Sequence, residues 1–410
     1  MTNESFFSLY PPIPSVRLGE LKDMAQEIIA KSASLEGKVA LQTARALGDR
    51  LRYLNSYYSN LIEGHKTTVI EIENALKKNF SEDEERKYAQ ELCVAHVLAE
   101  RELMDEVIEN PPNNICDFEF VGKIHQKFYA QLPEHHQYTH DSNGFTNIYV
   151  APGQMRDNNV SVDGGFSQLG PDAKHLPKKY SEFSEYYHPK NFHGDEKLLA
   201  VAASHHRLGW LHPFKDGNGR VTRLFSGLYL SQIGINQSNL WSLSRGFSRD
   251  KQWYMINLQS ADSPAEGMTG FNQEFFADYC MYFLETCLDQ INFMEKMLNL
   301  QKINTKIDQY INDRNRMTET FNHLDPRAGR LLKALFQQGE IPRNEAMSIL
   351  NMADKSERHV RRIVSQVVKE GLAWSKTHKS PLRIGLPLHI LPYYFPDLFD
   401  PLVFGSNQSF

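Results

Sequence analysis

A twelve-residue stretch from His212 to Arg223 constrains this chain more than any other feature. It reads His-Pro-Phe-Lys-Asp-Gly-Asn-Gly-Arg-Val-Thr-Arg, so one histidine, one acid, three small residues and two arginines stand close together. Apolar residues precede it, and others follow it at helical spacing: Leu224, Phe225, Leu228 and Tyr229. This pattern predicts a loop between two helices, the second beginning at Asp216 or Gly217 and stopping at Gly234.

A loop that leads into a helix offers an anion-binding site, because the first N–H groups of the helix are free and its dipole is positive there. Gly217 and Gly219 let the backbone approach a phosphate and adopt positive φ. Asn218 adds an amide donor. Arg220 and Arg223 lie three residues apart on one helix face and provide forked donors for phosphate oxygens.

Two further side chains of the stretch point to group transfer. Asp216 is suited to hold Mg²⁺ together with substrate phosphates, and His212 accepts a proton near neutral pH. A Gly-Asn-Gly turn or a helical Arg pair is usually structural when it occurs alone, and the Lys-Ser/Thr of a P-loop is absent. The combination predicts phosphoryl or nucleotidyl transfer onto a hydroxyl group.

The stretch resembles the signature of Fic-domain proteins, His-x-Phe-x-Asp/Glu-Gly-Asn-Gly-Arg-x-x-Arg, at every fixed position. The resemblance implies a protein adenylyltransferase that uses ATP and Mg²⁺ and moves AMP to a Ser, Thr or Tyr hydroxyl of a target protein. His212 would then be the base, and Asp216 would hold the metal. Five residues would hold the phosphates: Gly217, Asn218, Gly219, Arg220 and Arg223.

An upstream segment, Ser59-x-x-x-Glu63-Gly64, resembles the inhibitory motif Ser/Thr-x-x-x-Glu-Gly/Asn of many Fic proteins. The residues themselves predict a helix that ends near Gly64, with Ser59 and Glu63 stacked on one side. A carboxylate near a helix C-terminus is unfavourable unless a cation meets it, although a solvated Glu is the ordinary alternative. The resemblance implies that Glu63 pairs with Arg223 and blocks the productive position of the ATP γ-phosphate.

Residues 144–165 alternate between apolar and polar and are bounded by Gly and Pro, which predicts a β-hairpin. The segment resembles the Fic flap, whose edge holds a target segment by strand addition. Arg156, Val160 and Val162 are therefore candidate target-docking residues, with Met155 standing where the family usually has Tyr.

Two other groups of side chains leave alternatives open. Trp253 and Tyr254 resemble the aromatic end of a family helix near the nucleotide base, so stacking on adenine and ordinary core packing are both open. The histidines at 135, 136 and 140 form a cluster with some metal-site character, but they lie in a polar stretch, so we favour solvated histidines.

The expected fold class is mainly α: a Fic-type helical bundle with a small β-hairpin flap, followed by a C-terminal winged helix-turn-helix. The N-terminal helices are expected to start after Ser15, which reads as a cap before Leu18. Four segments are predicted: residues 1–110 with the inhibitory helix, 111–300 as the catalytic domain, 301–324 as a linker helix, and 325–410 as the winged helix and tail.

The predicted winged helix is basic within an otherwise acidic chain. Between Asp325 and Gly385 there are twelve Lys or Arg against six Asp or Glu, a net charge of +6, whereas the whole chain carries −5. Arg358, Arg361 and Arg362 lie on its third helix and are candidates for a DNA major groove. Winged helices also dock proteins, so DNA and protein remain equal alternatives.

Composition restricts the class of protein further. With 41% hydrophobic and 23% charged residues the chain is an ordinary globular protein, and its net charge argues against a whole-molecule nucleic-acid surface. Its four cysteines have no metal-site spacing and are expected to be buried thiols. Neither a signal sequence nor a membrane-length apolar run is present, so we expect a cytoplasmic protein; a homodimer stays open.

Two alternative functions fit the same residues. The first is removal of AMP, or transfer of another phosphate-containing group, on the same scaffold. The second is a DNA-binding regulator whose Fic domain modifies mainly itself.

Overall fold

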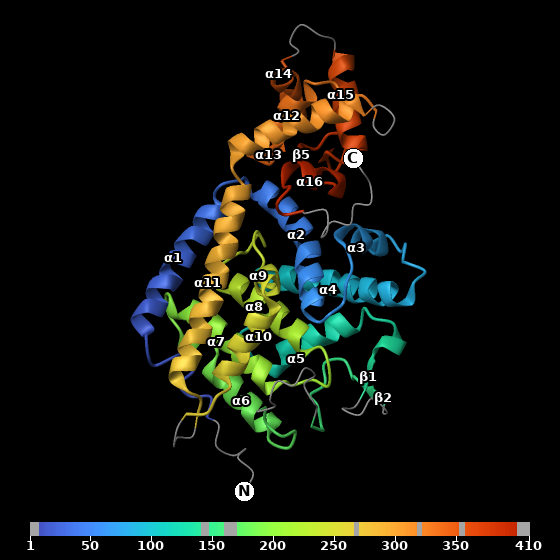
Figure 1. The fold of residues 1–410 in the computed structure, drawn as a ribbon. Helices are drawn as coiled ribbons and strands as arrows, with labels where there is room; N and C mark the ends of the chain where they lie inside the picture. Colours follow the sequence, from blue (N-terminus) through green and yellow to red (C-terminus); the bar gives the residue numbers. More distant parts are fainter. Residues whose placement is uncertain are drawn as a thin grey trace.

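The computed structural model describes residues 8–140, 147–159, 170–265, 270–317, 322–351 and 357–399, and these residues form a mainly helical molecule, as predicted (Figure 1). The N-terminal helices are α1 (Leu18–Glu36), α2 (Leu41–Ile62), α3 (Val69–Leu76) and α4 (Glu84–Glu109). The central helices are α5 (Phe118–Tyr129), α6 (Leu176–Tyr186), α7 (Glu196–Leu211), α8 (Asn218–Gln232), α9 (Leu243–Arg249), α10 (Lys251–Ala261) and α11 (Gln273–Met297). The C-terminal helices are α12 (Leu300–Arg316), α13 (Ala328–Gln338), α14 (Ala346–Ile349), α15 (Glu357–Lys369) and α16 (Leu391–Tyr394).

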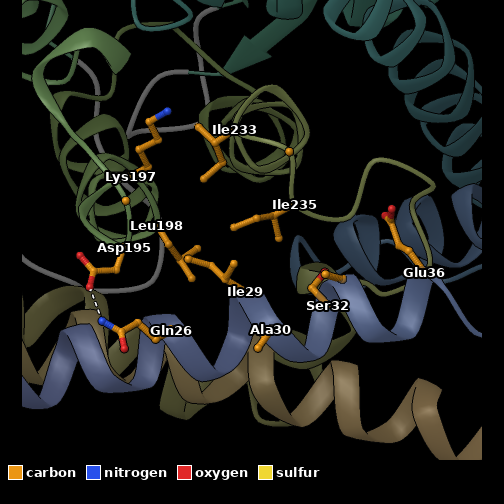
Figure 2. Close-up of a pocket in the computed structure, with 13 residues that line it drawn as sticks. Gln26, Ile29, Ala30, Ser32, Glu36, Asp195, Lys197, Leu198, Ile233 and Ile235 are labelled. Carbon is orange, nitrogen blue, oxygen red and sulfur yellow. Dashed lines mark hydrogen bonds between the residues drawn. The ribbon is translucent and has the colours of Figure 1, made fainter.

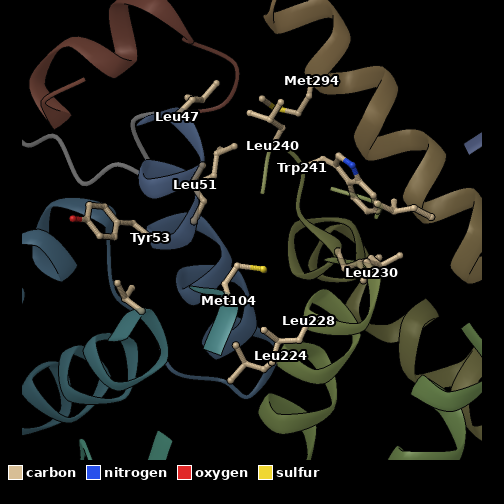
Figure 3. Close-up of a cluster of buried hydrophobic side chains, with 14 of the residues drawn as sticks. Leu47, Leu51, Tyr53, Met104, Leu224, Leu228, Leu230, Leu240, Trp241 and Met294 are labelled. Carbon is tan, nitrogen blue, oxygen red and sulfur yellow. The ribbon is translucent and has the colours of Figure 1, made fainter. Parts of the chain in front are cut away.

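Helices α7 and α8 form the centre of the fold and are joined by the loop at residues 212–217. The middle of α7 reads Ala-Val-Ala-Ala over residues 200–203 and is fully buried, because small side chains let neighbouring helices approach it closely. Helix α1 packs along α11 beside this pair. Figure 3 shows side chains from four helices meeting in one apolar cluster: Leu47 and Leu51 of α2, Met104 of α4, Leu224 and Leu228 of α8, and Met294 of α11.

The start of α1 differs from the prediction. Ser15 does not cap the helix, which begins at Leu18 after Arg17 in a left-handed conformation (φ 53°). Instead, the Ser15 backbone N–H and hydroxyl both donate to Gln273 Oε1 at 3.1 Å. Ser15 therefore ties the N-terminal arm to the first turn of α11.

A small hairpin begins before the predicted segment at residues 144–165. Strands β1 (Tyr138–His140) and β2 (Asn147–Tyr149) pair antiparallel, whereas residues 153–159 of the predicted flap form turns without a strand. Gly153 has φ 76°, and a Cβ at either Gly153 or Gly122 would lie only 3.0 Å from the carbonyl oxygen of the other residue. This contact holds the segment against α5, and the other predicted flap residues, Val160 and Val162, lie outside the described residues.

The C-terminal segment combines helices α13 to α15 with three short strands. Strands β3 (Glu340–Ile341), β4 (Ala373–Trp374) and β5 (Leu382–Ile384) form a sheet in the order β3-β5-β4. Helix α15 buries one apolar face, made of Val360, Ile363, Val364 and Val367. Its opposite face is exposed and carries the α15 arginines, our name for Arg358, Arg361 and Arg362.

Helix α2 joins the C-terminal segment to the central helices (Figure 1). At its start, the Thr43 hydroxyl donates to the Phe336 carbonyl at 2.9 Å. Gly339 sits beside it with φ 76°, and a Cβ there would be 2.9 Å from the Cβ of Ala40. The opposite end of α2 carries Ser59 and is followed by Glu63.

A cavity of about 770 Å³ opens at the far end of α7 and α8 from the loop at 212–217, beside α1 (Figure 2). Its walls include Ile29, Leu198, Ile233 and Ile235, and a Gln26–Asp195 hydrogen bond of 2.8 Å closes one edge. The four cysteines are free and buried, as predicted. Among the described residues, none of the helices combines the length and apolar character needed to cross a membrane.

Candidate active site

The loop between α7 and α8 is shaped by two left-handed residues. Helix α7 ends where His212 adopts φ 48°, and α8 begins directly after Gly217 at φ 78°. Gly217 is required for a second reason, because a Cβ there would lie 2.8 Å from the ring of Tyr129. Both polar side-chain atoms of Asn218 are used inside the loop, at 2.9 and 2.8 Å from the N–H and C=O of Phe214. In this arrangement the Asn218 side chain stabilises the loop, and its contact with a phosphate stays a prediction.

The His212 ring is half-buried at the turn. Burial, and then the positive charge of Arg156, lower the pKa of His212 to about 4, although Asp216 and the Gly209 backbone act in the opposite direction. The imidazole is consequently neutral at pH 7 and able to accept a proton. This protonation state fits the predicted role of a base.

Arg156 supports this loop rather than facing outward. Its side chain is buried, with Nε donating to the His212 carbonyl at 2.7 Å and Nη2 donating to the Pro171 carbonyl at 2.6 Å. A third bond reaches the Asn158 carbonyl at 3.2 Å. Three of its donors bind backbone carbonyls, so Arg156 stabilises the loop in this structure, and its role in target docking stays a prediction.

Asp216 presents a carboxylate at the mouth of the loop. Oδ2 accepts a 2.7 Å bond from the Tyr129 hydroxyl and a 3.3 Å bond from Arg220 Nη2, while 42% of the side chain remains exposed. Burial opposes ionisation, but Arg220 and the hydrogen bonds outweigh it and lower the pKa of Asp216. An ionised and accessible carboxylate is the donor that Mg²⁺ prefers, so the residue fits a magnesium ligand.

His125 and Tyr129, both on α5, hold Asp216 in place. Neither role was predicted from the sequence. His125 stacks between Tyr129 and Phe214, with ring centroids 4.3 and 4.1 Å away. Its Nδ1 accepts the Gly153 N–H at 2.8 Å, so the proton is on Nε2, which lies 3.3 Å from the Asp216 carbonyl. Burial lowers the pKa of His125 to about 4 and keeps this ring neutral. The available signal was their spacing, since residues four apart share a helix face.

The predicted pair between Glu63 and Arg223 is present. Arg223 Nη2 donates to Glu63 Oε1 at 2.5 Å and to the Ser59 carbonyl at 2.9 Å, and Nε donates to the Ser59 hydroxyl at 2.9 Å. Gly64, at φ 95°, turns the chain away after α2. Burial opposes the charge of Glu63, but Arg223 and then Arg220 lower its pKa, so it is ionised at neutral pH.

The Glu63 carboxylate lies directly over the first turn of α8. A Cβ on Gly219 would collide with Glu63 Oε1 and would come within 3.2 Å of Arg223 Nη1. Gly219 therefore creates the space in which a negative group meets the start of α8, where the helix dipole favours anions.

Two nitrogen donors of Arg220 have no hydrogen-bond acceptor among the described residues. Its side chain is 5% exposed and lies 5.2 Å from the Phe128 ring, and Nη2 binds Asp216. Nε and Nη1 are buried and have no acceptor among the described residues. Because buried donors without acceptors cost free energy, a site for an anion with several oxygens fits this position.

The two aromatic candidates of α10 behave differently. Tyr254 is buried, stacks on Phe247 with centroids 4.4 Å apart, and its hydroxyl lies 2.9 Å from His205 Nε2. Tyr254 therefore packs in the core, and burial raises the pKa of its hydroxyl to about 12. Trp253 is 52% exposed.

Comparisons with known proteins agree with this geometry. Residues 115–230 match the model of the Fic/DOC family. The protein adenylyltransferases Fic of Drosophila willistoni and Drosophila melanogaster are each 35% identical over 91 residues, which are 21% of this chain and 16% and 17% of those proteins. The match thus spans about a sixth of the length of these relatives.

Solved structures show the same fold at low identity. A Fic domain containing signaling protein from Bacteroides thetaiotaomicron has a TM-score of 0.50 and 18% identity, covering 66% of this chain and 95% of that one. Fic-1 from C. elegans also has a TM-score of 0.50, with 14% identity, covering 67% and 71%. The loop, the helices that hold it and the family match lead to one conclusion: this chain contains a Fic domain of the Fic/DOC family over residues 115–230.

Proposed function

We propose that this chain is a Fic-type protein adenylyltransferase, which moves AMP from ATP to a Ser, Thr or Tyr hydroxyl of a target protein. The observation that carries the proposal is the position of the Glu63 carboxylate. This negative side chain lies over Gly219 at the start of α8 and pairs with Arg223. A phosphate would meet the N–H groups at the start of α8 and the two Arg220 donors that have no acceptor among the described residues.

In this reaction His212 takes the proton of the incoming hydroxyl, a step that typically contributes about 10²–10⁴-fold. The hydroxyl oxygen forms a bond to the α-phosphorus, the bond from that phosphorus to the β-phosphate oxygen breaks, and pyrophosphate leaves. The N–H groups at the start of α8 and the Arg220 guanidinium stabilise the charge that develops on the phosphoryl oxygens. Asp216 would hold Mg²⁺, which when bound neutralises phosphate charge.

Glu63 makes the resting state inactive in this proposal. Its carboxylate occupies the Arg223 donor that the γ-phosphate would need, so ATP would bind without its productive geometry. Ser59 holds the same guanidinium through two further bonds, which remain available whether or not Glu63 is in place. Activation then requires only that Glu63 leaves, because Arg223 is already positioned.

The test uses Glu63→Gly protein and ATP labelled at the α-phosphate in a cell lysate, with Glu63→Gly/His212→Ala protein as the blank. We expect α-phosphate label on protein in the first sample alone, and no more γ-phosphate label in that sample than in the blank. Equal labelling in the blank, or no labelling in either sample, would overturn the proposal. Release of AMP from a pre-modified protein without transfer would favour the removal reaction.

For the C-terminal segment we propose binding to duplex DNA through a winged helix-turn-helix. The supporting observation is that α15 buries its apolar face and leaves the α15 arginines exposed on the other. An exposed basic helix face of this kind suits a major groove.

A further inference from the structure

We infer that the chain has a zinc-class metal site away from the catalytic loop, formed by Glu91, His135 and His136. Glu91 lies on α4, and the two histidines lie on the 3₁₀ turn Glu134–His136, labelled η2. One ligand atom from each of the three side chains lies within 4.8 Å of the other two. In the sequence the histidines lie in a polar stretch without a nearby partner of this kind. The fold brings the Glu91 carboxylate, 45 residues away from His136, next to them.

The spacing needs only a small adjustment to close around an ion. Zinc binds His nitrogen at about 2.0–2.1 Å and carboxylate oxygen at about 2.0–2.2 Å, so tetrahedral ligands are roughly 3.3–3.5 Å apart. His136 Nε2 and Glu91 Oε2 are now 2.5 Å apart, and the two imidazole centroids are 3.9 Å apart. An ion would separate the first pair by about 1 Å and would turn the two imidazole rings apart so that a nitrogen of each faces it.

The chemistry of the three ligands selects the kind of ion. Two neutral imidazoles and a carboxylate are a common zinc set, whereas Mg²⁺ and Ca²⁺ prefer oxygen ligands. Glu91 is only 8% exposed, and a buried carboxylate is costly unless a cation or several donors meet it. His135 is exposed, which leaves an entry path for the ion and room for a water as fourth ligand.

The position of the site gives it a structural consequence. The η2 turn leads directly into β1, so a bound ion would fasten the root of the β1–β2 hairpin to α4. On the other side, the Tyr88 ring lies 4.4 Å from that of His136 and 5.2 Å from that of His65, the second residue after Glu63. The site therefore borders the segment that carries the inhibitory carboxylate.

The experiment is a calorimetric titration of tag-free, chelator-treated, full-length protein with ZnCl₂ in excess MgCl₂, which occupies the carboxylate of the catalytic loop. The wild type is compared with His135→Ala, which alters an exposed side chain, and with Glu91→Gln, which keeps the shape of the buried group. His193→Ala is the matched control, because it removes an exposed histidine elsewhere.

We expect the wild type and the His193 variant to bind one more equivalent of zinc than the other two proteins. Zinc should also slow hydrogen exchange of the η2 amides in the wild type but not in His135→Ala. Identical stoichiometry and affinity in all four proteins would overturn the inference, as would a wild type that binds no zinc.

Discussion

Replacing Glu63 with glycine is expected to raise AMP transfer by one to two orders of magnitude. The Arg223 side chain is 2% exposed and keeps both bonds to Ser59 after the change, so the guanidinium stays in position. The substitution removes one charge-assisted hydrogen bond, a contribution of about 1.5–3 kcal/mol. Since about 1.4 kcal/mol corresponds to tenfold, the predicted gain is roughly 10- to 150-fold.

The assay measures initial rates of α-phosphate label incorporation at saturating ATP, together with the thermal shift produced by ATP. Glu109→Gly is the control, because it makes the same substitution at the exposed C-terminal end of α4. Glu63→Gln should give an intermediate rate, because it keeps an acceptor for Arg223 but loses the charge. Rates in the glycine variant that equal those of the Glu109 control would refute the proposed inhibition.

Three further predictions concern the loop and the C-terminal segment. Tyr129→Phe removes the hydroxyl that donates to Asp216, a hydrogen bond to a charged group worth about 1.5–3 kcal/mol. The Mg²⁺ concentration for half-maximal activity should therefore rise roughly tenfold or more, and an unchanged concentration in a magnesium titration contradicts the assigned role. In Glu63→Gly protein, kcat/KM should fall on the acid side near pH 4, because His212 with a pKa of about 4 stays neutral above that value; an acid limb near pH 6.5 in the pH–rate profile argues against it as the base. Changing the three α15 arginines to alanine should reduce the log–log salt slope for a fluorescent DNA duplex by about 3, and wild-type protein that fails to bind duplex at low salt excludes the DNA proposal.

Local sequence was sufficient for the elements that neighbouring residues determine. The turn at Gly217 and the end of α2 at Gly64 follow from glycines at positive φ next to helical spacing, and both were predicted. The pairing of Glu63 with Arg223 joins residues 160 apart, and it came from resemblance to a known motif rather than from periodicity.

The contacts of the site that could not be predicted from the sequence depend on tertiary packing. Tyr129 reaches Asp216 across 87 residues, and no local pattern distinguishes it from an ordinary core aromatic. Adenine stacking and core packing were both open for Tyr254, and the fold stacks its ring on Phe247. Strand β1 lies before the predicted hairpin segment, and the close approach of Gly153 to α5, which no local pattern shows, supports the chain after β2.

Helix α2 serves two interfaces with a single rigid rod. Thr43 and Ser59 are sixteen residues apart on it, about 24 Å along the axis. One residue inserted between them would rotate one end against the other by about 100° and lengthen the rod by about 1.5 Å. Either the hydrogen bond between Thr43 and Phe336 or the hydrogen bonds between Ser59 and Arg223 would then break. The contacts at both ends together therefore fix the number of residues in this helix.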